Sequence, residues 1–272
     1  MILSLDSLSI YREIDIASAK PTLEERDGIK HFGIDEISVD EPFDVTKFFD
    51  FYDTAKKYAI ENNKNLIIVG GSGFYLKAML DGISGISGIS GFDGSFELNH
   101  EDKLWIEDLL SNLNNSYNFI KQLDKEYIKN IEQNDRYRLE KALLIYKSTG
   151  LSPTEYFKQN PPKPIINADE IDLYEVAIET PKLRDKIALR TQIMLDTGIL
   201  DEVLYLEKKY SRAPNPMKSI GIKECLDYFD GKIGKDELKE KIIINTAQLA
   251  KRQRTFNKKF EAKRISTIDE IR

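Results

Sequence analysis

An α/β fold is predicted by two short apolar runs that end in polar or glycine turns, with helical patterns around them. Residues 3–5 (Leu-Ser-Leu) stop abruptly at Asp6-Ser7, and residues 66–69 (Leu-Ile-Ile-Val) are followed by Gly-Gly-Ser-Gly at 70–73 and then by a helical stretch. Continuous apolar runs of this length are typical of buried strands in a parallel sheet. Ligands of open α/β sheets bind beyond the carboxyl ends of the strands. Both turns are therefore candidate parts of a site.

The composition is that of an ordinary globular protein of 272 residues, 41% hydrophobic and 32% charged, with a net charge of −6. No apolar run approaches the roughly 20 residues of a membrane-spanning helix, and we expect no membrane contact. Cys225 is the single cysteine, which excludes an intramolecular disulfide and favours a cytoplasmic setting. Two distant histidines and this cysteine give no zinc cluster, and we predict no metal-ligating residues.

The remaining elements follow from periodicity and turn residues. Apolar residues recur at helical spacing over 45–61 after the N-cap candidate Asp44. Residues 82–90 repeat Gly-Ile-Ser three times and are read as a flexible linker. Residues 171–178 are expected to form a strand, and 23–30 a short helix at best. Further helices are expected over 74–80, 101–150, 181–197, 200–209 and most of 222–260. The predicted organisation is an α/β core in 1–85, an inserted helical domain in 86–160, and a second core part in 161–272 with basic C-terminal helices.

Several side chains have both a structural and a functional interpretation. Arg190 shares a helix stripe with Leu183, Ile187 and Met194, so it needs an anionic partner, either an acidic side chain or a ligand phosphate. Asp6 is either a turn cap or a reactive carboxylate. The glycine turn either offers amides to an anion or lets a helix pack closely. The acidic net charge excludes a globally basic coat, yet residues 251–264 carry seven basic side chains and one acid, which suits RNA contact as well as a solvated face.

Six segments in order resemble one family, the tRNA dimethylallyltransferases, also called tRNA isopentenyltransferases. Residues 6–12 with 15–21 look like its D-S-x-x-x-Y-x-x-x-D-I-[AG]-[ST]-A-K-P segment, and residues 70–75 are similar to its G-G-[TS]-x-x-Y turn. Residues 134–138 (Asn-Asp-Arg-Tyr-Arg) resemble N-D-x-Q-R, and 198–203, 220–224 and 248–256 match later family blocks. The matches run across nearly the whole chain.

The resemblance implies a P-loop NTPase-like parallel sheet with an inserted helical domain. It also implies transfer of a dimethylallyl group from dimethylallyl diphosphate to N6 of the adenosine beside the tRNA anticodon, with Mg²⁺, by a cytoplasmic monomer. In this reading Asp6 is the general base, Arg190 contacts the diphosphate, and Ser72 lies near the target nucleotide. The implied contacts to the tRNA anticodon stem-loop are Asp6, Ser7, Leu8, Ser9, Lys20, Ser72, Arg136, Tyr137, Arg138, Lys251 and Arg252.

Three departures from the family pattern qualify this expectation. The phosphate loop G-x-T-x-x-G-K-[ST], which precedes the Asp-Ser strand in the family, does not occur in the 272 residues. We therefore expect the chain as printed to lack the first strand and to be inactive or nearly so. Tyr137 stands where the family usually has glutamine, and Ala247 replaces an arginine.

Three other readings stay open. An adenylate isopentenyltransferase acting on free nucleotides has little need of the basic C-terminal helix or the insertion. A non-catalytic tRNA-binding fragment is compatible with the missing phosphate loop. An unrelated α/β protein requires the ordered motifs to be coincidence.

Overall fold

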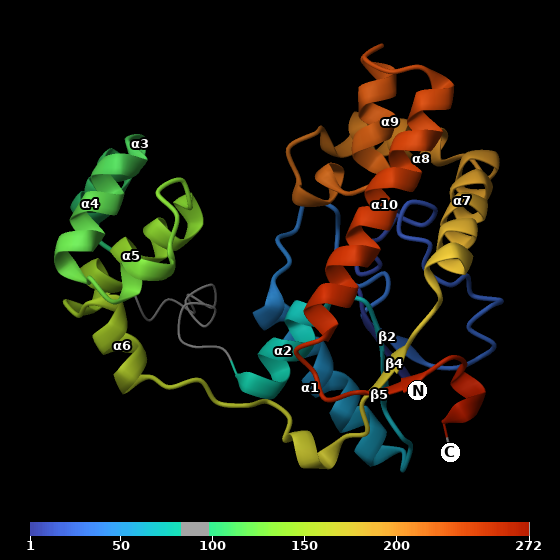
Figure 1. The fold of residues 1–272 in the computed structure, drawn as a ribbon, viewed down its shortest axis with the longest axis horizontal. Helices are drawn as coiled ribbons and strands as arrows, with labels where there is room; N and C mark the ends of the chain where they lie inside the picture. Colours follow the sequence, from blue (N-terminus) through green and yellow to red (C-terminus); the bar gives the residue numbers. More distant parts are fainter. Residues whose placement is uncertain (83–97, 272) are drawn as a thin grey trace. The chain divides into compact units, whose positions relative to one another are not determined.

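The computed structural model describes residues 1–82 and 98–271, and its chain divides into two compact units (Figure 1). The α/β unit comprises Met1–Phe43, Lys47–Leu76 and Ala168–Arg272, and the helical unit comprises Asp44–Thr46 and Lys77–Asn167. The sequence placed the insertion at 86–160, whereas the helical unit begins within the helix that follows the glycine turn. Most of the Gly-Ile-Ser repeat lies outside the described residues.

The α/β unit contains two small parallel sheets, as the fold-class prediction requires. In the first sheet the strand order is β2-β1-β3, with β1 Ile2–Leu5 between β2 His31–Phe32 and β3 Ile67–Gly70. Leu5 pairs with Gly70 at the carboxyl ends of β1 and β3. The second sheet pairs β4 Tyr174–Val176 with β5 Lys263–Ile265. The α/β prediction is confirmed, and the two turns singled out by the sequence start from adjacent strand ends.

One face of β3 is open, contrary to the expectation of a fully buried strand. Ile67 is 56% exposed and Val69 is 53% exposed. The apolar run predicted burial on both sides because interior parallel strands are covered on both faces. β3 is instead the edge strand of its sheet, and no segment within 1–82 or 98–271 pairs with its free side.

The α/β unit also contains helices, and one core joins helices α7 to α10 to the N-terminal loops. α7 and α9 pack against α10, and α8 packs against α9 (Figure 1). Ile10, Ile14 and Val39 from the loops are buried with Ile199 and Ile242 from the helices. The helices are α1 Val45–Glu61, α7 Thr180–Asp196, α8 Ile199–Tyr210, α9 Ile222–Phe229 and α10 Lys235–Asn257, with short 3₁₀ turns at Ala168–Glu170, Asn215–Lys218 and Ile268–Glu270.

The short helix expected over 23–30 does not form. The chain makes successive turns there, with the amide of Arg26 donating to the carbonyl of Thr22 at 3.0 Å. Asp27 and Gly28 then adopt φ values of 45° and 69°, which are left-handed and end any helical run. By contrast, α1 has the predicted bounds, and Asp44 Oδ1 accepts from the amide of Thr46 at 3.0 Å as an N-cap should.

The helical unit has its own core, as an inserted domain requires. Ile106, Leu110, Ile120, Leu139 and Leu143 are buried together. Its helices are α2 Gly73–Asp81 (which begins in the α/β unit), α3 His100–Ser111, α4 Leu113–Leu123, a 3₁₀ turn at Tyr127–Asn130, α5 Arg136–Thr149 and α6 Pro153–Gln159. α5 ends at Gly150, whose φ of 72° is the left-handed C-terminal cap predicted from the sequence.

The glycine turn after β3 serves close packing. A Cβ added at Gly70 would lie 2.2 Å from the carbonyl oxygen of Leu5, and one at Gly71 would lie 2.3 Å from Nε2 of Gln253 on α10. The amides of Ser72 and Gly73 donate to Leu5 and Gly71, at 3.1 and 3.0 Å, so neither is free for an anion. Of the two readings of this turn, the packing interpretation is the one that these contacts support.

Replacing Gly70 by alanine is therefore expected to destabilise the α/β unit, by roughly 1–3 kcal/mol, because the new Cβ meets backbone rather than a flexible side chain. The free energy of unfolding in urea measures this loss. Gly234→Ala is the matched control, since nothing lies within 4 Å of its added Cβ and its φ is −84°. Equal stability of the two variants would contradict the packing role of Gly70.

Candidate active site

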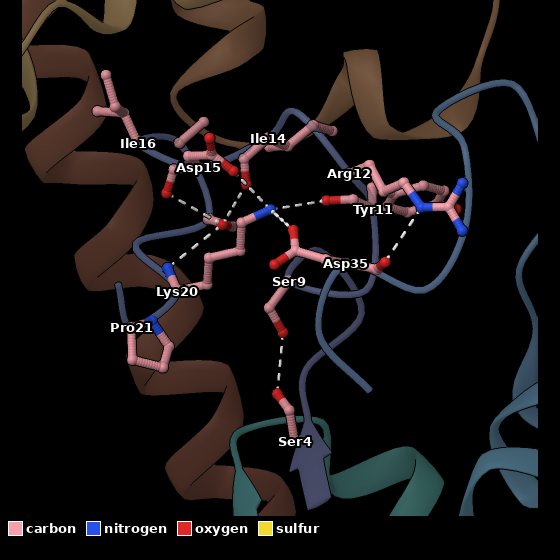
Figure 2. Close-up of polar contacts among 12 residues, drawn as sticks. Ser4, Ser9, Tyr11, Arg12, Ile14, Asp15, Ile16, Lys20, Pro21 and Asp35 are labelled. Carbon is pink, nitrogen blue, oxygen red and sulfur yellow. Dashed lines mark hydrogen bonds and ion pairs between the residues drawn. The ribbon is translucent and has the colours of Figure 1, made fainter. Parts of the chain in front are cut away.

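Asp6 follows β1 directly, and one of its carboxylate oxygens organises the turn. Oδ1 accepts from the amide of Leu8 at 2.7 Å and from the amide of Ser9 at 3.1 Å. The hydroxyl of Ser9 is buried and bonds to Ser4 Oγ at 2.9 Å (Figure 2). Ser7 is exposed at the tip of the turn. The capping interpretation of Asp6 therefore holds for Oδ1, while Oδ2 makes no hydrogen bond to any described residue and stays available.

Ser72 lies at the same edge of the sheet as Asp6. The pairing of Leu5 with Gly70 brings the two strand ends together, and the amide of Ser72 donates to the carbonyl of Leu5, the residue before Asp6. The hydroxyl of Ser72 has no hydrogen-bond partner in the described part of the chain, and the residue is half-buried. A free carboxylate oxygen and a free hydroxyl thus flank this edge.

Tyr11, the tyrosine of the first motif, is not a second candidate base. Its side chain is buried, and burial raises the pKa of its phenol to about 12. At neutral pH the ring stays protonated and packs edge-on against Phe43, with ring centroids 6.3 Å apart. Tyr11 therefore supports the loop by packing.

Lys20, expected to contact RNA or phosphate, holds a loop instead. Its side chain is only 4% exposed, and Nζ donates to the carbonyl of Tyr11 at 2.9 Å and contacts Asp15 at 2.7 Å and Asp35 (Figure 2). These three acceptors match the three protons of the ammonium group. The lysine therefore ties together the two ends of residues 11–20, and no proton remains for a phosphate.

The Lys20–Asp35 contact gives a pH-dependent stability. Burial of Asp35 raises its pKa, but hydrogen bonds from Lys20 and Arg26 outweigh burial and lower the pKa below its ordinary value. The stabilisation is present at neutral pH and is lost as pH falls through that lowered pKa. Asp35→Asn should therefore destabilise most at pH 7 and least at pH 3, measured by urea unfolding.

The exposed Asp27 provides a control for this comparison, because its carboxylate makes no ion pair with any described residue. Asp27→Asn is expected to unfold with the same midpoint as the unaltered protein at both pH values. If the penalty of Asp35→Asn were as large at pH 3 as at pH 7, the carboxylate of Asp35 would not be the titrating partner.

Arg190 lies outside the core, so the prediction that it shares a core-facing helix stripe with Ile187 and Met194 is wrong. The buried face of α7 consists of Ile187, Thr191 and Met194, and Arg190 is exposed at the flank of that face. Within 1–82 and 98–271 its hydrogen bond is from Nη2 to the carbonyl of Ser18, at 3.4 Å. No acidic side chain of the described residues pairs with it. The structural ion pair allowed by the sequence is not formed, and the guanidinium is free for a ligand anion.

Two glutamates that the sequence did not single out, Glu202 and Glu224, lie in the segments 198–203 and 220–224 and hold backbone amides. Glu202 on α8 accepts from three successive amides, those of Asp15 and Ile16 at 2.9 and 2.7 Å and that of Ala17 at 2.9 Å. Glu224 is buried, accepting from the amide of Gly221 and from Asn245, both at 2.7 Å. An acidic residue in the first turn of a helix was the available signal, but its usual meaning is a local cap.

In the helical unit, the expected RNA contacts at the start of α5 are partly structural. Arg136 Nη1 donates to the carbonyl of Leu110 at 3.0 Å, which ties α5 to α3. Arg138 pairs with Asp135, the N-cap of its own helix. The ring of Tyr137 is 59% exposed, with Lys141 Nζ 5.6 Å from its centroid. Of the three expected residues, Tyr137 presents the largest free surface, suited to stacking on a base.

The basic C-terminal run, which begins on α10 and continues past its end, divides into bound and free cations. Arg254 donates to the carbonyl of Ile178 and to Thr180 Oγ1. These bonds tie α10 to the segment that leads from β4 into α7. Lys259 lies over the ring of Phe256, 4.5 Å from its centroid. Lys251 and Arg252 are exposed and form no ion pair within the part of the chain that the structure describes. These two keep the availability expected of phosphate contacts.

No group of three or more histidine, cysteine, aspartate or glutamate side chains gathers in 1–82 or 98–271. The donor set therefore does not fit a resident Mg²⁺ held by the protein alone. Ions of this kind usually keep several waters and bind through one or two carboxylates and substrate phosphates.

Comparison with known proteins decides the family. The IPP transferase family model matches residues 9–260. The chain belongs to this family. It is accordingly an enzyme of the prenyltransferase class, with the α/β fold of that family. None of the described helices combines the length and apolar character that crossing a membrane needs.

Individual IPP transferases cover most of the chain. The tRNA dimethylallyltransferase of Aliarcobacter butzleri is 51% identical over 100% of this chain and 87% of its own length. The tRNA dimethylallyltransferase of Sulfurovum sp. is 52% identical over 94% of this chain and 82% of its own. The crystal structure of a tRNA isopentenylpyrophosphate transferase from Staphylococcus epidermidis is 28% identical, with a TM-score of 0.61 over 97% of this chain and 83% of that one.

Proposed function

We propose that this protein transfers a dimethylallyl group from dimethylallyl diphosphate to N6 of the adenosine beside a tRNA anticodon. The names of the relatives support tRNA as the substrate. The observation that carries the chemical assignment is that Asp6 uses Oδ1 for its turn and keeps Oδ2 free at the carboxyl edge of the sheet. A carboxylate held rigidly with one open oxygen is what a general base needs.

In the proposed reaction the exocyclic amine attacks the first carbon of the dimethylallyl group. A new C–N bond forms as the C–O bond to the diphosphate breaks, and Asp6 takes one proton from the amine. The diphosphate leaves with the bonding pair and its negative charge, which the guanidinium of Arg190 stabilises. The free hydroxyl of Ser72, at the same edge as Asp6, holds the nucleotide by a hydrogen bond.

The tRNA contributes a single-stranded anticodon loop, from which the target base must be unstacked to reach such a site. Lys251 and Arg252 are the proposed phosphate contacts, and Tyr137 the proposed stacking surface, because these side chains are exposed. Arg136, Arg138 and the turn at Ser7 to Ser9 are weaker candidates, since most of their groups are engaged within the protein. We further propose a cytoplasmic setting, on the grounds of the single buried cysteine, and a monomeric state.

Mg²⁺ is proposed only as an ion that accompanies the diphosphate. When bound with the diphosphate, such an ion would neutralise charge on the leaving group. No residue of the chain is assigned to hold it, and none of the steps above depends on it.

A non-catalytic tRNA-binding role is the second candidate for the 272-residue polypeptide. No G-x-T-x-x-G-K-[ST] motif occurs in it, and the amides of Ser72 and Gly73 are used within their own turn. A polypeptide of these residues alone is expected to bind tRNA and to transfer the prenyl group at a strongly reduced rate. A role on free adenylate is disfavoured by the free cations of α10 and by the helical unit.

One experiment separates these readings. The protein expressed from its own gene, and the 272-residue polypeptide, are each incubated with labelled dimethylallyl diphosphate and either an anticodon stem-loop RNA or AMP. Label in the RNA, located on the adenine amine by mass spectrometry, supports the proposal. Label in AMP alone supports the adenylate reading, and RNA binding without label in either preparation supports a binding role.

A further inference from the structure

A single carboxylate on α8 holds three successive amides of residues 11–20, here called the anchor loop. Glu202 Oε2 accepts from Asp15 and Ile16, at 2.9 and 2.7 Å, and Oε1 accepts from Ala17 at 2.9 Å. None of these three amides has a backbone acceptor among the described residues, and the bonds of Ile16 and Ala17 are partly buried, where an unpaired amide is costly. The conformation of the anchor loop at 15–17 therefore depends on Glu202.

The residue after these three amides contacts Arg190. The carbonyl of Ser18 accepts from Arg190 Nη2 at 3.4 Å, and the hydroxyl of Ser18 donates to the carbonyl of Ile14 at 2.5 Å. Ala19 then takes a φ of 48°, which reverses the chain toward Lys20. The Ser18 carbonyl is thus held between a segment fixed by Glu202 and a lysine fixed by its three acceptors. It is the one described group that orients the exposed guanidinium.

We propose that Glu202 is a positioning residue for prenyl transfer: its carboxylate fixes the anchor loop, and the Ser18 carbonyl of that loop fixes the guanidinium of Arg190. The inference rests on the proposed function, because the role of Arg190 belongs to that function. It can also be tested without an activity assay, because the hydrogen bonds of the three amides can be measured by themselves. A misplacement of about 1 Å at a reacting group can reduce a rate roughly 10²-fold, so an indirect contact of this kind has a measurable effect.

Glutamine is the informative replacement for Glu202. Its side chain has the same length and shape, but one of its two terminal atoms is an NH₂ group, which donates and cannot accept. In Glu202→Gln the NH₂ group therefore faces at least one of the three amides, and that hydrogen bond is lost. The volume of the side chain stays the same. Glu207→Gln is the matched control, because Glu207 lies on the same helix and pairs with Arg212, not with the anchor loop.

Amide hydrogen exchange tests the anchor without reference to activity. In Glu202→Gln, exchange at Asp15, Ile16 and Ala17 is expected to speed up by roughly tenfold or more, with the α1 amides unchanged. Glu207→Gln should leave all three amides at the rates of the unaltered protein. Unchanged exchange at 15–17 in Glu202→Gln would overturn the proposal at its first step.

Kinetics test the link to Arg190. Glu202→Gln is expected to lower kcat by about tenfold or more while changing the KM for RNA by less than about twofold. In an Arg190→Lys background the same change should lower kcat little further, since the group it positions has been replaced. A full additional loss in that background, or an unchanged kcat beside faster amide exchange, would overturn the positioning role.

The two proposals fail in different ways. If the unaltered protein labels no RNA, the proposed function fails, whatever the exchange data show. If the unaltered protein labels RNA and Glu202→Gln does so equally well, the proposed function stands and the role of Glu202 is refuted. Circular dichroism melting of both glutamine variants excludes general unfolding as the cause of a lost rate.

Discussion

Asp6→Asn is expected to reduce kcat for prenyl transfer by roughly 10²- to 10⁴-fold, the range typical of losing a positioned general base. The reason lies in the two oxygens of Asp6. An asparagine keeps an acceptor at Oδ1 for the amides of Leu8 and Ser9, which lie 2.7 and 3.1 Å away. It replaces Oδ2 by an amide nitrogen that cannot take a proton. The turn is preserved and the base is removed.

The measurement compares single-turnover rates with the free energy of unfolding. Stability of Asp6→Asn should stay within about 0.5 kcal/mol of the unaltered protein, whereas Asp6→Ala should lose both the rate and the turn. Asp44→Asn is the control, because Asp44 Oδ1 accepts from the amide of Thr46 in a comparable way. A normal rate in Asp6→Asn would exclude Asp6 as the base, and a lost rate in Asp44→Asn would show that the assay reports turn geometry.

Arg190→Ala is expected to lower kcat by about 10²- to 10³-fold with almost no change in stability. The guanidinium is exposed and, among the residues that the structure describes, makes one hydrogen bond, of 3.4 Å, to the carbonyl of Ser18, so its removal should cost little stability. A cation that stabilises charge on the departing diphosphate acts mainly in the transition state, so kcat should fall more than the KM for dimethylallyl diphosphate rises.

Arg184→Ala provides the matched control for this variant. Arg184 is an exposed arginine on the same helix, and within the described residues it forms no ion pair. Its removal changes the net charge by the same amount and should leave kcat unchanged. Equal losses in both variants would mean that general electrostatic attraction, and not a contact from Arg190, accounts for the effect.

Much of this protein is determined by local sequence. The bounds of α1, the left-handed cap at Gly150 and the strand before Asp6 follow from patterns that act over a few residues, and the structure agrees with each. The six ordered motifs also pointed to the correct family, because they preserve turns and side chains in a fixed order. Spacing along the chain is sufficient for such features since cap, strand and turn chemistry is local.

What only the tertiary structure decided is the partner of each polar group. Lys20 and Arg190 both looked like candidates for phosphate, yet Lys20 is buried among acceptors and Arg190 is exposed beside a single carbonyl. The glycine turn at 70–73 could either bind an anion through its amides or allow close packing, and the approach of Gln253 to Gly71 supports close packing. Glu202 was unremarked because its three amides lie more than 180 residues away. Periodicity reports which face of an element is apolar, but a hydrogen bond between distant segments depends on how those faces meet.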